Sequence, residues 1–149
     1  MQFFSSSTGA SISTLGAVLV LCGTFLPTYG SGDYEPAGFR NAPVFLLALL
    51  VAPALLVLVS SVFAWFRPLP RWLVVLCLVI VILAFVLHLL GSRLGAVFAC
   101  FDVCPPGGVH FGTGFWLPLV GFPLSAIGLA VVAAAEKRRS LPGPPAASL

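Results

Sequence analysis

Residues 44–90 decide the fold class, because they read VFLLALLVAPALLVLVSSVFAWF (44–66), RPLPR (67–71) and WLVVLCLVIVILAFVLHLL (72–90). The two long segments contain no Asp, Glu, Lys or Arg, and each has roughly the 20 apolar residues that an α-helix needs to cross a bilayer. The short segment between them holds two prolines and two arginines. Such a segment ends one helix and leaves only a tight polar turn before the next. This stretch therefore predicts a hairpin of two membrane-spanning helices.

Two further apolar segments flank the hairpin. They cover residues 11–29 and 115–135 and also lack acidic and basic side chains. With 60% hydrophobic and only 7% charged residues, the chain lies outside the range of water-soluble domains, in which about a quarter of the residues are charged. We therefore expect an all-α integral membrane protein with one domain, residues 1–135. Four transmembrane helices would form an antiparallel up-and-down bundle, with outer loops at 30–43 and 91–114.

The basic residues predict the orientation of the bundle. The hairpin turn and the segment after the last span hold five of the seven, and the predicted outer loops hold only Arg40 and Arg93. The positive-inside rule places the more basic side in the cytoplasm. Both termini are therefore expected to be cytoplasmic, in a multi-pass protein of the plasma membrane. Residues 136–149 are expected to form a basic stop-transfer segment and a disordered tail. The five topology anchors are Arg67, Arg71, Lys137, Arg138 and Arg139.

Glycine recurs every seven residues in the first and fourth spans and their flanks, at positions 9, 16, 23 and 30 and at positions 107, 114, 121 and 128. Seven residues are nearly two helical turns, so the glycines within a helix form one smooth stripe. In lipid such stripes let two backbones approach closely. We expect the first and fourth helices to pack antiparallel along this seam, and a seam against a second copy is the alternative. The predicted seam residues are Gly16, Gly23, Gly114, Gly121 and Gly128.

Most residues that could carry chemistry lie in the second outer loop or just below it. Cys100 and Cys104 are the cysteines expected outside, where the compartment is oxidising in most cells, and the Pro-Pro-Gly-Gly that follows them favours a turn. A structural disulfide that shapes the loop is the leading interpretation. The polar candidates near it are Arg93, Asp102, His110 and His88.

Two alternative chemistries use the same residues. Quinone-linked disulfide-forming membrane proteins are similar in architecture, since they are four-helix bundles with outer cysteines. However, they need two communicating cysteine pairs, normally including a Cys-x-x-Cys, and this chain has one outer pair with three residues between its members. A metal or haem site would combine Cys100, Cys104 and His110, with His88 as a further ligand, but this spacing does not match the usual zinc motifs. No metal and no cofactor are therefore predicted.

No motif for a soluble substrate is present: the sequence has no phosphate loop, no His-Glu-x-x-His and no Gly-x-Ser-x-Gly. The uncharged spans disfavour ion pumps, proton-coupled carriers and small multidrug exporters, which depend on membrane-embedded charge. The basic residues flank apolar spans, so nucleic acid is not an expected partner. We expect a non-enzymatic protein of the lipid bilayer that assembles with itself or with a larger membrane protein. The alternatives are a membrane thiol-disulfide oxidoreductase, and a small facilitator that passes a neutral or lipid-like solute beside the prolines of the fourth span.

Overall fold

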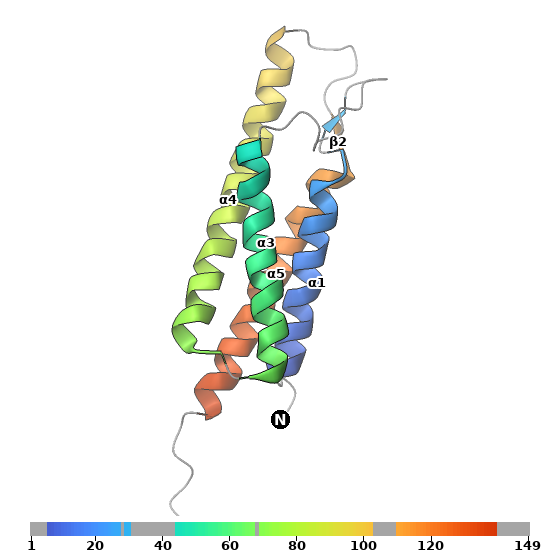
Figure 1. The fold of residues 1–149 in the computed structure, drawn as a ribbon. Coiled ribbons are helices and arrows are strands. Elements are labelled where there is room, and N and C mark those ends of the chain that lie inside the picture. The colour runs from blue at the N-terminus through green and yellow to red at the C-terminus, as the bar shows by residue number, and fades with distance from the viewer. Residues whose placement is uncertain (1–5, 28, 31–43, 68, 103–109, 140–149) are drawn as a thin grey trace, which may run out of the picture.

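The computed structural model describes residues 6–27, 29–30, 44–67, 69–102 and 110–139. In this part the chain is helical apart from short connections and two paired strands of two residues each (Figure 1). The helices are α1 (Ser6–Thr24), α3 (Val44–Phe66), α4 (Arg71–Asp102) and α5 (Thr113–Arg139). The strands are β1 (Tyr29–Gly30) and β2 (His110–Phe111), with Tyr29 opposite Phe111 in an antiparallel pair.

The helices have the length and surface of membrane-embedded elements. Among the described residues, three helical stretches are long and apolar enough to cross a bilayer: Ser7–Thr24, Arg71–Gly91 and Thr113–Arg138. Large apolar side chains also face outward, for example Phe63 on α3, Leu83 on α4 and Ile127 on α5. A water-soluble protein rarely exposes so much contiguous apolar surface. Lipid is therefore the solvent that fits this exterior, and the structure supports a membrane location.

The boundaries of α1 and the C-terminal end of α4 differ most from the sequence prediction. Helix α1 begins at Ser6, not near residue 11, and ends at Thr24, because Pro27 lacks the amide hydrogen that a further turn needs. Helix α4 continues to Asp102, so the first half of the expected outer loop, residues 91–102, is helical. No proline interrupts the sequence between Pro70 and Pro105, and backbone hydrogen bonding does not depend on whether a segment is apolar enough for lipid.

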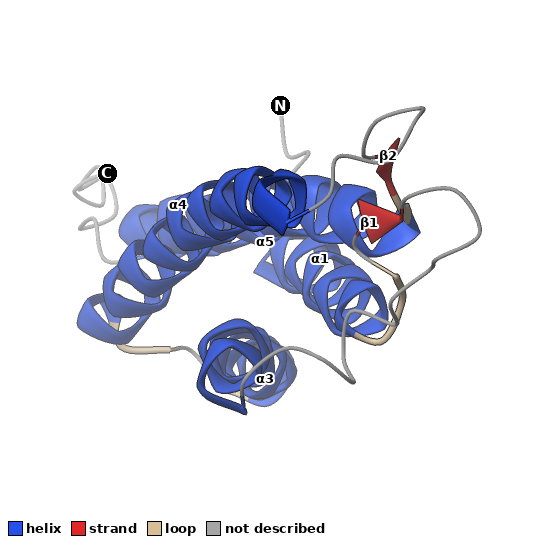
Figure 2. Cartoon of the chain, turned by 90° about the horizontal axis from the view of Figure 1, so that it is seen from above, coloured by secondary structure: helices blue, strands red, loops and turns tan. Residues whose placement is uncertain are grey.

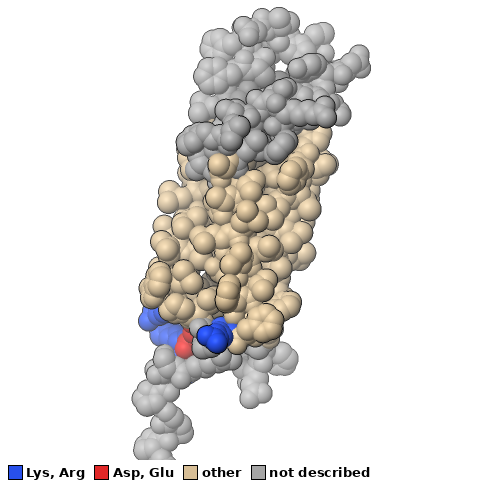
Figure 3. Space-filling model, in the orientation of Figure 1, with Lys and Arg blue, Asp and Glu red and all other residues tan. Residues whose placement is uncertain are grey.

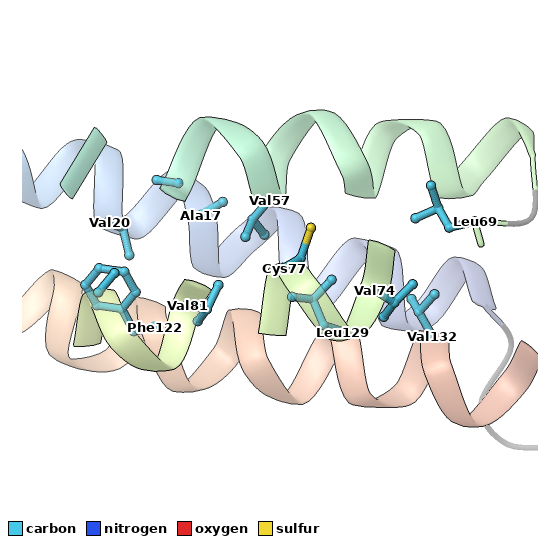
Figure 4. Packing of buried hydrophobic residues seen from close by; sticks show 12 residues of the cluster. Ala17, Val20, Val57, Leu69, Val74, Cys77, Val81, Phe122, Leu129 and Val132 are labelled. Atoms are coloured by element: carbon cyan, nitrogen blue, oxygen red, sulfur yellow. The ribbon is translucent and has the colours of Figure 1, made fainter. Parts of the chain in front are cut away.

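Helices α1 and α5 form the central pair of the bundle. Helix α3 packs mainly on α1, while α4 packs on α5 and more lightly on α3 (Figure 2). Apolar side chains from all four helices meet in one core cluster, which includes Val20 of α1, Val57 of α3, Cys77 of α4 and Phe122 of α5 (Figure 4). The core thus lies among all four helices, with α3 packed on α1, α4 packed on α5, and the α1–α5 contact joining the two pairs.

Three hydroxyl groups in α1 donate to backbone carbonyls of their own helix. Ser11 Oγ donates to the carbonyl of Ser7 at 3.0 Å, and Thr14 Oγ1 donates to that of Ala10 at 2.8 Å. At the end of the helix, Thr24 Oγ1 donates to the carbonyl of Leu21 at 2.6 Å. Such bonds lower the cost of placing serine and threonine in lipid, where no water replaces a missing partner.

Candidate functional site

The glycine seam between α1 and α5 is packed so closely that a Cβ atom at any of its glycines would clash with the opposite helix or its flank. A Cβ atom placed on Gly16 would lie 2.5 Å from the carbonyl oxygen of Gly121, and one placed on Gly121 would lie 2.7 Å from the carbonyl oxygen of Gly16. Side-chain carbons essentially never approach backbone oxygen so closely. Glycine at both positions therefore allows the two backbones to touch.

The same contact repeats along the pair. A Cβ atom on Gly9 would lie 2.8 Å from the carbonyl oxygen of Gly128, Gly23 meets the ring of Pro118, and Gly114 meets the carbonyl of Leu26. As residue numbers increase along α1, the residues of α5 that they contact have decreasing numbers. The structure brings all five predicted seam glycines into one intramolecular interface.

A hydroxyl group adds a polar contact to the seam. Ser125 Oγ of α5 donates to the carbonyl oxygen of Ser13 in α1 at 3.4 Å, and both residues are fully buried. A Cβ atom on Gly16 would also lie 2.5 Å from this same Oγ. The hydroxyl of Ser13 itself has no hydrogen-bond partner among the described atoms. Ser125 therefore joins two helices, whereas Thr24 bonds only within its own helix.

His88 lies in an aromatic cluster between α4 and α5. Its ring stacks on that of Phe115, with centroids 5.5 Å apart at an angle of 24°, and its Nε2 lies 3.4 Å from the Phe115 carbonyl oxygen. Phe122, one heptad further along α5, lies 6.1 Å from His88 and 6.1 Å from Phe85, centroid to centroid. The tautomer with hydrogen on Nε2 donates to the carbonyl. His88 is thus packed as an interhelical contact, and this placement was not evident from the sequence.

The two described thiols lie on different helices and in different environments. Cys77 is buried in the core, 3.4 Å from the hydroxyl oxygen of Ser60 on α3, while Cys22 is exposed on α1, and both are free. Cys100 lies in the last turns of α4, but its side chain is not described, and Cys104 lies outside the described residues. The disulfide between Cys100 and Cys104 stays a prediction.

Of the other polar candidates in the predicted outer loop, only Arg93 has a described side chain. Arg93 is exposed on α4, Asp102 ends that helix, and His110 begins β2, although the side chains of the last two are not described. Within the ranges given above, no group of three or more His, Cys, Asp or Glu side chains could hold a metal ion. Whether the predicted outer-loop residues come together stays a prediction, because most of their side chains are not among the described residues.

Charged side chains collect at the opposite end of the bundle, where α3 ends, α4 begins and α5 ends (Figure 3). There, Glu136 Oε1 of α5 accepts a hydrogen bond from the backbone amide of Leu69 at 2.7 Å. A carboxylate that accepts such a bond typically contributes about 1.5–3 kcal/mol. This bond ties the α3–α4 turn to the last turn of α5.

Comparison with family models, curated proteins and solved structures finds no match to this chain.

The Leu69–Glu136 contact had no signal in the sequence. The two residues are 67 positions apart, and Glu136 read simply as part of a basic stop-transfer segment. The partner of His88 was equally hidden, because Phe115 and Phe122 belong to a different span. A spacing of seven between two aromatic residues marks one helical face, but it does not say which helix that face will contact.

Proposed function

We propose that this chain is a non-enzymatic membrane protein that crosses the bilayer four times and serves as a scaffold for assembly with itself or with a larger membrane-protein partner. The observation that supports this function is the α1–α5 seam, in which backbone meets backbone from Gly9 to Gly23 of α1. Such contact leaves no room for a solute between these helices. It also holds them in one relative position, as a scaffold requires.

The topology is part of the proposal. Helix α3 has 23 residues and a length of roughly 35 Å at 1.5 Å per residue, which supports a fourth crossing beside the other three. The contact of Gly9 with Gly128 and Val132 brings the start of α1 beside the second half of α5. This half of α5 leads to the end of the bundle at which Arg67, Arg71 and Lys137 lie. An antiparallel bundle in the plasma membrane with both termini in the cytoplasm accounts for these positions. The disulfide of Cys100 and Cys104 would then shape the outer loop.

Orientation can be tested by labelling intact cells with a membrane-impermeant thiol reagent. In a chain whose native cysteines are replaced by serine, Glu35→Cys should be labelled and Ser140→Cys should not, because the two positions lie on opposite sides of the membrane. Permeabilised cells should label both, which controls for accessibility. Labelling of Ser140→Cys from outside would contradict the proposed orientation.

Assembly can be tested with a photoreactive amino acid at outward-facing positions in cells. We expect Val59 of α3 or Leu83 of α4, which are both exposed, to give a discrete protein adduct larger than the chain. The buried Val57 of α3 is the matched control and should give only crosslinks within the chain. Lipid adducts alone from a set of outward positions on all four helices would contradict assembly. Solute uptake by reconstituted vesicles, or electron transfer to added quinone, would favour the facilitator or the oxidoreductase.

A further inference from the structure

The described cationic side chains are distributed unevenly over the molecule. Arg93 lies in the second half of α4. The other four lie together at one end of the bundle, where Figure 3 shows lysine and arginine in blue. Two of these four lie at the end of α3 and the start of α4, the other two lie in the last turn of α5, and all are exposed. We refer to them as the basic rim, which consists of Arg67, Arg71, Lys137 and Arg138.

The turn between α3 and α4 is folded so that its arginines face outward. Leu69, in the middle of the turn, is only 9% exposed and joins the core cluster with Val74 and Val132 (Figure 4). Its backbone amide donates to Glu136 Oε1 at 2.7 Å. The turn is therefore held in two ways: the Leu69 side chain packs into the core, and the Glu136 carboxylate of α5 binds the Leu69 amide. Arg67 and Arg71, two residues to either side of Leu69, are left exposed beside the end of α5.

Charge at the rim is far from balanced. Glu136 is the one acidic side chain among the described residues at this end, and one of its oxygens is engaged by the Leu69 amide. Guanidinium groups present several hydrogen-bond donors in a planar fork that fits phosphate. The rim thus has the charge and the donor geometry of a phosphate-binding surface.

Two tryptophans set the rim at a defined depth. Trp65 near the end of α3 and Trp72 at the start of α4 are 56% and 68% exposed. Exposed indoles at helix ends prefer the boundary between hydrocarbon and headgroups. Arg67 is two residues after Trp65, and Arg71 is directly before Trp72. Both arginines therefore reach the level of the lipid phosphates.

We propose that the basic rim binds the phosphate of anionic lipid headgroups and enriches such lipids around this end of the bundle. This inference rests on the membrane placement in the proposed function, but not on which side of the membrane the rim faces. Clusters of several Lys and Arg beside a membrane helix attract anionic lipid, each residue adding a favourable increment. A lipid is favoured over free phosphate because the rim is held at headgroup depth, where the phosphate groups of lipids are concentrated.

The tryptophans allow a local measurement of lipid composition. The purified chain would be placed in phosphatidylcholine vesicles that contain a minority of brominated phosphatidylglycerol, and quenching of tryptophan fluorescence would be measured. Trp116→Phe leaves the two indoles at the rim as reporters, whereas Trp65→Phe with Trp72→Phe leaves Trp116 at the other end of the bundle. We expect anionic lipid to be enriched near the rim reporters at least about fivefold over its level near Trp116.

Charge variants test which residues cause the enrichment. In the Trp116→Phe chain, Arg67→Gln with Arg71→Gln should reduce the enrichment at least about fivefold, while Arg93→Gln, also an exposed arginine of α4, should leave it unchanged. Molar NaCl should reduce it in the unaltered rim, because salt screens exposed charges. This salt measurement remains decisive if the double variant does not fold. Millimolar inorganic phosphate should not displace the lipid.

Three results would overturn the inference: equal enrichment at both sets of reporters, enrichment that survives both salt and the arginine changes, or displacement by millimolar inorganic phosphate. Failure of the proposed membrane placement would look different. In that case brominated phosphatidylcholine would quench none of the tryptophans. Quenching by brominated phosphatidylcholine without a preference for phosphatidylglycerol would leave the placement intact and refute only the lipid site.

Discussion

Replacement of Gly16 by alanine is expected to destabilise the protein by about 2–3 kcal/mol, although alanine is the better helix former by about 0.5–1 kcal/mol. The added Cβ would lie 2.5 Å from the carbonyl oxygen of Gly121 and from the amide nitrogen of Ser125. Neither backbone atom can rotate away, so α1 and α5 must separate. Separation weakens dispersion contacts along the whole seam, and lipid does not restore them.

The matched control is Gly91→Ala in α4. A Cβ atom on Gly91 would have no neighbour within 4 Å, so only the helix propensity changes and the protein should gain up to about 1 kcal/mol. Both variants can be compared by reversible unfolding with sodium dodecyl sulfate in mixed micelles. Equal stability of the Gly16 and Gly91 variants would show that the α1–α5 seam is not the tight interface described above.

Replacement of Phe122 by alanine is the second change with a large expected effect. Phe122 is buried at the junction of α5 and α4, where its ring meets Phe85 and His88. In water part of the cost of such a change is lost hydrophobic burial, but in lipid both the folded and the unfolded ring lie in an apolar medium. The cavity and the lost contacts remain, and we expect a loss of about 2–3 kcal/mol.

Ile127→Ala provides the control on the same helix. Ile127 is 54% exposed, and lipid can fill the space that its side chain leaves. Its loss should therefore change the free energy of unfolding by less than about 0.5 kcal/mol, measured in the same micelles. A cost at Ile127 equal to that at Phe122 would indicate that this face of α5 is covered by protein in solution.

The sequence identified the seam residues because glycine has a visible period. A repeat of seven places Gly16 and Gly23 on one face of α1, and Gly121 and Gly128 on one face of α5. It did not distinguish a seam within the chain from a seam between copies, since both bury the same stripe. The contact of Gly16 with Gly121 places the seam within the chain.

Helix boundaries were predicted well only where proline or charge marked them. The α3–α4 turn was readable because Pro68 and Pro70 interrupt hydrogen bonding beside two arginines, and α3 begins and ends at the predicted residues. The other end of α4 was not readable. Hydropathy falls after Leu90 although the helix continues to Asp102, because a helix satisfies its backbone equally well inside and outside lipid.

The sequence by itself determined that the chain is built of apolar helices, because uncharged segments of that length can satisfy their backbone in lipid only as helices. It also determined where most of the basic residues would gather, since two lie at the ends of the α3–α4 turn and three lie in the last turn of α5. Only the tertiary structure decided which helices touch and which polar atoms meet. The bond of Glu136 to the Leu69 amide and the stacking of His88 on Phe115 join segments that no local pattern relates. Contacts of that kind depend on how whole helices pack, and a sequence period marks only one face of one helix.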